Sequence, residues 1–391
     1  MATVTSRIER LPAWVGGLIP LVLVAALLGV FLLTDPIGEL REVPPVEAVA
    51  VERTVLETGE IELHVRNDGP DPVTIAQVLV DDAYWDYTIG DSTLGRLEGT
   101  TVRLTYPWDE DLPLNIKLVT ATGVTIEHEI EVAAVTPDLD SETLRIYGLL
   151  GVYIGVIPVA VGLLWFPALR RASRRWLGFF LAVTIGLLAF LLVDTIAEGL
   201  ELAGEAAGAF DGVGLFASGA LAAVAALTWI GAALTRRRAA LGAGLVLAYL
   251  IAAGIGLHNL GEGLAVGAAL AAGEIALGTF LVVGFALHNT TEGLAIVAPL
   301  GTRTERPALW HFIALGALAG VPTVFGAWLG GFAFSPAPGA LAFGIAAGAI
   351  AQVIWSIARS MASDERGLSG SVALGFVVGL AVMYVTGLFA A

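Results

Sequence analysis

Two short segments of the chain carry the same metal-ligand residue types at the same spacing. Residues 258–263 read HNLGEG, and residues 288–293, 30 positions later, read HNTTEG. Residues four apart share one face of an α-helix, so His258 faces Glu262 and His288 faces Glu292. Asn259 and Asn289 lie at the edges of those faces. Neutral imidazole and ionised carboxylate bind zinc and its neighbours, so two such helices side by side predict a divalent-metal site.

The charge balance favours the same interpretation. Two buried glutamates bring two negative charges, which one divalent ion would neutralise, and without an ion the carboxyl groups would tend to take up protons. The alternative is a polar network that only joins two helices. That alternative fits a single His-x-x-x-Glu pair well, but it does not require the same residue types at the same spacing twice.

The elements that must position these residues are membrane-spanning. Of 391 residues, 57% are hydrophobic and 14% are charged, the mean hydropathy is +0.82, and there are 48 glycines. Apolar runs of about 20 residues, enough to cross roughly 30 Å of hydrocarbon, recur along the chain. One run covers 11–33 and is predicted to be an uncleaved anchor helix. Eight more follow, at 147–169, 176–202, 213–234, 240–272, 275–299, 308–334, 339–358 and 370–388.

The connectors between these spans predict one orientation. Basic residues occupy the first, third, fifth and seventh connectors, whereas the second, fourth and sixth contain no lysine or arginine. By the positive-inside rule the basic connectors lie in the cytoplasm together with Arg7 and Arg10. The expected location is the cell membrane, with the C-terminus and the segment 43–140 outside.

Segment 43–140 differs in composition from the rest of the chain. Apolar and polar residues alternate around Leu63, Ile75, Leu104 and Ile126, and turn sequences separate these runs. The pattern predicts an all-β immunoglobulin-like sandwich. Its His64 and His128 are interpreted as ordinary strand residues, because neither belongs to a ligand cluster.

Charge and cysteine content exclude other kinds of site. The net charge is −16 and Lys117 is the only lysine, so the chain lacks the basic footprint that nucleic-acid binding needs. There is no cysteine, which excludes disulfides and thiolate ligands. Any metal must be held by histidine, carboxylate and amide groups.

On these motifs, the part of the chain from 147 to 391 resembles the ZIP (Zrt/Irt-like) metal-ion transporters. The resemblance implies an eight-helix bundle with both ends outside, inverted repetition and alternating access. It implies that His258, Glu262, His288 and Glu292 form a primary metal site. It also implies that Asn259 and Asn289 are ligands of a second site that shares both glutamates.

The sequence departs from the family pattern in three places. The proline at the fourth motif position is replaced by Gly261 and Thr291, so a helix break must be made without proline. A glutamate expected before the sixth-helix proline is Val321. The acidic residues often found in the seventh helix are replaced by Gln352 and Ser356. These differences favour a carrier that handles one ion at a time, and the number of ions stays open.

Three polar residues outside the motifs are candidates for the transport path. Asp194 and Glu198 lie one turn apart in the second span and are a candidate entrance, or they simply reach external water. His311, near the start of the sixth span, is a candidate exit residue, although a single interfacial histidine is commonly incidental.

The resulting prediction is an all-α polytopic membrane protein with an inserted β-domain. Its parts are a cytoplasmic N-terminus and anchor helix at 1–42, an extracytoplasmic β-domain at 43–140 and a metal-transport domain at 141–391. The expected function is gradient-driven transport of zinc, with iron(II) or manganese as other candidates. A small-residue interior permits a homodimer, and the sequence does not identify a ligand for the β-domain.

Two other functions were weighed against transport. A membrane sensor would hold a static ion and signal through the β-domain without flux, and this reading stays open. An intramembrane metalloprotease would require His-Glu-x-x-His with a free glutamate as base, which the chain does not match, so no enzyme activity is expected.

Overall fold

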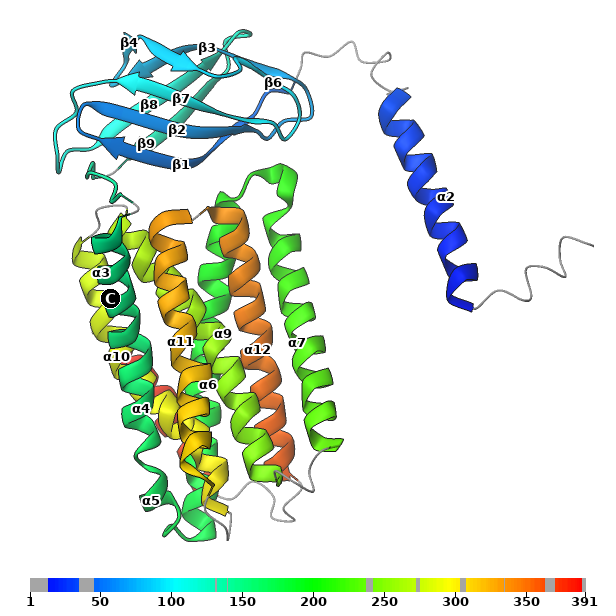
Figure 1. Cartoon of the computed structure of the whole chain (residues 1–391), viewed down its shortest axis with the longest axis vertical. Coiled ribbons are helices and arrows are strands. Elements are labelled where there is room, and N and C mark those ends of the chain that lie inside the picture. Colours follow the sequence, from blue (N-terminus) through cyan, green and yellow to red (C-terminus); the bar gives the residue numbers. More distant parts are fainter. Residues whose placement is uncertain are drawn as a thin grey trace, which may run out of the picture. The chain divides into compact units, whose positions relative to one another are not determined.

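The computed structural model describes residues 13–34, 46–130, 132–138, 140–236, 242–271, 275–302, 307–333, 335–362 and 370–388 (Figure 1). The chain forms two compact units, Met1–Val46 and Glu47–Ala391. The first unit contains the helix α2 (Ala13–Thr34), whose sequence is apolar apart from its last residue. This helix covers most of the predicted anchor run, whereas Arg7 and Arg10 lie outside the described residues.

The second unit begins with an antiparallel β-domain. One sheet has the order β1-β2-β7-β5, and the other has the order β4-β3-β8-β9, with β6 paired to β3. The strands are β1 (Val49–Glu57), β2 (Glu60–Asn67), β3 (Val73–Val80), β4 (Ala83–Trp85), β5 (Tyr87–Ile89), β6 (Thr93–Leu94), β7 (Gly99–Thr105), β8 (Leu114–Thr120) and β9 (Thr125–Ile130).

Alternating side chains from both sheets bury one shared core. Leu63 and Leu104 come from the first sheet, Ile75 and Ile116 from the second, and none is more than 2% exposed. The alternation in the sequence therefore correctly predicted a separate β-domain. The sequence analysis did not single out β8, which pairs with both β3 and β9. The immunoglobulin-like assignment stays a prediction.

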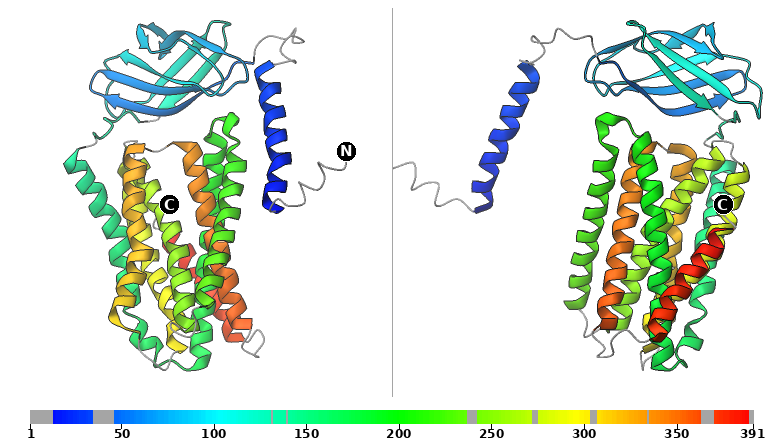
Figure 2. Two further views of the ribbon diagram at one scale, coloured as in Figure 1. Left: turned by 45° about the vertical axis from the view of Figure 1, so that its right-hand side comes forward. Right: turned by 180° about the vertical axis from the view of Figure 1, so that it is seen from behind.

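The rest of the second unit is helical. In the described residues, seven helical segments are long and apolar enough to cross a membrane, and α13 is a shorter apolar helix. The elements are α3 (Ser141–Gly151), η2 (Val152–Val156), α4 (Ile157–Leu163), α5 (Phe166–Leu169), α6 (Arg174–Glu205), η3 (Gly208–Phe210), α7 (Gly212–Arg236), α9 (Ala243–Ala271), α10 (Ile275–Val297), η4 (Ala298–Thr302), α11 (Leu309–Ala333), α12 (Pro336–Ala362) and α13 (Gly370–Gly387). The long helices run side by side, and the right-hand view of Figure 2, from behind, shows α13, in red, crossing in front of them at an angle.

Polar contacts connect the β-domain to the helical part. The Arg53 guanidinium donates to the carbonyl of Phe332, at the end of α11, across 2.6 Å. The backbone N–H of Gly208, which follows α6, donates to the Asp68 carboxylate across 2.7 Å. Both contacts involve chain segments at or beside the connectors that lack lysine and arginine. Several arginines of the basic connectors, Arg237, Arg238, Arg303, Arg306 and Arg366, lie outside the described residues.

Helices α9 and α11 pack backbone to backbone through glycines. A Cβ on Gly263 of α9 would collide with the carbonyl of Thr323, and a Cβ on Gly330 of α11 would collide with that of Leu264. Small residues at such contacts let helices approach closely, which supplies the packing that association in lipid depends on. Helix α9 continues from Ala243 to Ala271 without interruption, so the break expected around Gly261 is not present.

The glycine contact gives a testable prediction about helix packing. Gly330→Ala should destabilise the protein by about 1–3 kcal/mol, because the added methyl group overfills a closed contact. Gly204→Ala on α6 is the control, since a Cβ there meets nothing within 4 Å. The control should be neutral or slightly stabilising, because alanine favours helix more than glycine does. SDS-induced unfolding of the purified protein measures both, and equal stabilities would contradict the packing argument.

Candidate metal centre

The four motif side chains come together inside the helical bundle. One ligand atom from each of His258, Glu262, His288 and Glu292 lies within 4.8 Å of all the others, and all four residues are buried. Helix α9 carries the first pair and α10 the second. A tetrahedral ion with bonds of 2.0–2.2 Å keeps its ligands about 3.4 Å apart, so small side-chain shifts would close the group around one ion.

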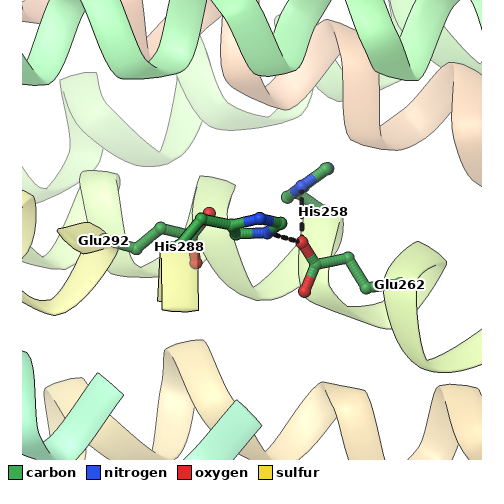
Figure 3. Close-up of side chains that lie close together, drawn as sticks. All are labelled: His258, Glu262, His288 and Glu292. Carbon is green, nitrogen blue, oxygen red and sulfur yellow. Dashed lines mark hydrogen bonds and ion pairs between the residues drawn. The ribbon is translucent and has the colours of Figure 1, made fainter. Parts of the chain in front are cut away.

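Glu262 is the centre of the polar contacts. Both imidazole rings point at its Oε1, as Figure 3 shows, with His258 Nε2 at 3.1 Å and His288 Nε2 as the second partner. Its other oxygen, Oε2, accepts a hydrogen bond from the Asn289 amide at 2.8 Å. The Glu262 carboxylate is thus held by His258, His288 and Asn289, which are themselves candidate ligands of the same ion.

Glu292 is in the opposite situation. It is only 2% exposed, and among the described residues neither carboxylate oxygen accepts a hydrogen bond of ordinary geometry. An ionised carboxylate buried in this way is strongly unfavourable without a counter-charge. A positive charge beside Glu292 would therefore stabilise its ionised form.

The two motif asparagines form a matching pair of contacts with neighbouring helices. The Asn259 amide donates to the carbonyl of Ala319 on α11 at 3.1 Å, and the Asn289 amide donates to that of Ile154 in η2 at 2.8 Å. The Oδ1 atom of each asparagine is buried and has no hydrogen-bond partner in the part of the chain that the structure describes. The amide nitrogens hold helices together, which leaves the two oxygens free for a cation.

A proline explains why Ile154 can accept this bond. In an α-helix the carbonyl of residue 154 would bond to the N–H of residue 158, but residue 158 is a proline and has none. The chain passes through the π-helical turn η2 just before it, where Ile157 N–H bonds to Val152 O. The Ile154 carbonyl, which Pro158 cannot bond, accepts the hydrogen bond from the Asn289 amide.

The last glycine of each motif has a packing role that the sequence analysis missed. Gly263 lies against the carbonyl of Thr323 on α11, and Gly293 lies against that of Val159 on α4. A side chain at either position would push the ligand-bearing helix away from its neighbour. The sequence feature that could have predicted this packing role is the glycine that directly follows the glutamate in each motif.

Helix α6 supplies further polar groups next to the cluster. Thr195 is buried, and its hydroxyl lies 3.2 Å from Nδ1 of His258. Glu198, half-buried, interacts electrostatically with both Asp194 and Glu262, whereas Asp194 is exposed. The two candidate entrance residues thus lie on the helix that reaches the cluster, and Thr195 between them was not predicted from the sequence.

The residues that depart from the ZIP pattern, Val321, Gln352 and Ser356, have the following surroundings. Val321 is 37% exposed, whereas Thr323 of the same helix is fully buried with a hydroxyl that has no hydrogen-bond partner among the described residues. Gln352 and Ser356 bond to each other, and Gln352 also donates to Thr228 of α7, which makes them a contact between α12 and α7.

The other histidines lie away from the cluster. His64 and His128 are strand residues, and His128 Nε2 lies 2.8 Å from the Thr54 hydroxyl. Burial lowers the pKa of His128. His311 does have a partner, because its Nδ1 lies 2.9 Å from the Tyr249 hydroxyl.

Comparisons with known proteins add little to this description. No family model matches the sequence, and no curated protein matches it. Among solved structures, the archaellum periplasmic stator protein FlaG from Sulfolobus acidocaldarius is similar at 11% identity, over 22% of this chain and 99% of that chain, with a TM-score of 0.19. A TM-score this low supports no conclusion about fold or function.

The contact between Asn289 and Ile154 gives a second prediction. Asn289→Ala should destabilise the protein by about 1–3 kcal/mol, because it leaves the buried Ile154 carbonyl without a donor. In a Pro158→Ala background, residue 158 regains an N–H, so the same substitution should cost less. A double-mutant cycle of SDS-induced unfolding measures the coupling, and strictly additive costs would contradict the assignment.

Proposed function

We propose that the protein carries divalent transition-metal ions across a membrane through the His258, Glu262, His288 and Glu292 cluster. The single observation that supports this most is the buried Glu292 carboxylate, which accepts no hydrogen bond of ordinary geometry from the described residues and lies beside two imidazoles inside a bundle of membrane-length helices. Ionisable residues in such helices mark ion pathways in general. The resemblance to ZIP transporters in the same residues points to the same function.

The proposal includes a specific arrangement in the membrane. Eight spans, with the shorter α13 as the last, follow the anchor helix α2, and alternating access exposes the cluster to each side in turn. The β-domain and the C-terminus lie outside the cell membrane and the N-terminus lies in the cytoplasm. The driving force is the gradient of the ion or of a coupled ion, and no enzyme activity is part of the proposal.

The donor set favours zinc, with iron(II) and manganese as further candidates. Two imidazoles and two carboxylates suit all three ions, so selectivity would follow from geometry and availability. The free Oδ1 atoms of Asn259 and Asn289 support a second ion beside the first, as the resemblance implies. The outward-facing Val321 supplies no carboxylate to it, which favours weak binding of that second ion.

A sensor is the second candidate function. The Arg53 contact to the end of α11 gives a direct link between the β-domain and the helix that α9 packs against. Such a link would transmit occupancy of the cluster to the β-domain. This function requires metal binding but no flux.

Proteoliposome uptake of zinc, manganese and iron(II) distinguishes the two functions. The native chain should show flux, and His258→Ala and Glu292→Gln should each lose at least about tenfold, as expected when an ion loses a ligand. His64→Ala is the control, because it removes a histidine of the β-domain and should transport normally. Stoichiometric metal binding by the native chain without flux would replace the carrier with the sensor.

A further inference from the structure

The two imidazoles of the cluster differ in how their second ring nitrogen is bound. Nε2 of each ring faces Glu262. Nδ1 of His258 lies 3.2 Å from the Thr195 hydroxyl, in a contact that is buried on both sides. Among the described residues, no hydrogen-bond partner is found for Nδ1 of His288, whose ring lies edge-on to Phe285.

The chemistry of imidazole makes this contact relevant to metal binding. A neutral ring carries one proton, and binding an ion through Nε2 requires that proton to be on Nδ1. A group that accepts a hydrogen bond from Nδ1–H fixes both the tautomer and the orientation of the ring. The Thr195 hydroxyl lies where such an acceptor must be.

A hydroxyl also suits the site when no ion is bound. Nε2 of His258 lies 3.1 Å from the Glu262 carboxylate, without hydrogen-bond geometry to any described residue, and the negative charge favours a proton on Nε2. In that tautomer Nδ1 is an acceptor, and the same hydroxyl can rotate to donate to it. Thr195 can therefore stay in contact with the ring in both states without moving its backbone.

We propose that Thr195 is a positioning residue that sets the ring orientation and tautomer of His258 for metal binding. The proposal rests on the proposed metal site and adds to it a residue from a third helix, α6. It makes His258 the pre-oriented imidazole of the pair and His288 the adjustable one. A purely packing role for Thr195 is the alternative, and it predicts no effect of the hydroxyl on the bound ion.

The test compares three variants of the full chain in detergent, with Co²⁺ and Zn²⁺ as probes. Thr195→Val removes the hydroxyl and keeps the shape of the side chain, whereas Thr195→Ser keeps the hydroxyl. Thr184→Val is the matched control, because Thr184 is equally buried on α6 and its hydroxyl donates to the Phe180 carbonyl, away from the cluster. Metal affinity, the visible absorption of bound Co²⁺ and the thermal unfolding of the metal-free protein are measured for each.

Thr195→Val should weaken Co²⁺ and Zn²⁺ binding about tenfold, the lower end of the range for loss of a hydrogen-bond partner of a metal ligand, and should change the Co²⁺ absorption bands. Thr195→Ser and Thr184→Val should bind as the native chain does. If Thr195→Val binds Co²⁺ with native affinity and spectrum, or if Thr195→Ser is equally impaired, the positioning role is wrong. Absence of metal binding by the native chain would instead overturn the metal site itself.

Discussion

The need to accommodate two neighbouring carboxylates inside an apolar bundle is the constraint on which the rest of this structure depends. Glu262 and Glu292 are 4% and 2% exposed. Two negative charges so close together, and away from water, repel each other and lose their hydration. Glu262 is compensated by two imidazoles and an amide, whereas Glu292 is not. A cation at the cluster would supply that compensation.

Contacts of the backbone hold these side chains in place. Proline at 158 frees a carbonyl that fixes Asn289, and glycines at 263 and 293 let the ligand-bearing helices lie directly on α11 and α4. In a membrane interior, a freed carbonyl must find a donor within the protein. The contacts that satisfy the backbone are thus the same contacts that orient the site.

The sequence predicted the parts of the molecule that depend on periodicity. Apolar runs predicted long apolar helices, alternation predicted the β-domain, and a four-residue spacing paired each histidine with its glutamate. It did not predict which partner each asparagine amide takes, because that depends on a carbonyl freed by a proline 131 positions away in the chain, at 158 against 289. Thr195 was not predicted either, because a single threonine in an apolar helix forms no recognisable pattern. The expected break in α9 was wrong, because the helix continues through Gly261, and Gly263 beside it is a packing contact with α11.

The π-helical turn and Pro158 lie between two differently attached halves of one helix. Gly151, before the turn, and Gly155, within it, are in close contact with Val324 and Thr323 of α11, and Gly162, after Pro158, is in close contact with Gly293 of α10. Helix α11 is in turn packed on α9, so these glycine contacts connect the first half to the helix of one His-Glu pair and the second half to the helix of the other. A change in the distance between the two His-Glu pairs would therefore act both on the contact of Ile154 with Asn289 and on the chain between residues 155 and 162. The turn thus connects the two His-Glu pairs through a helix that contributes no residue to the cluster itself.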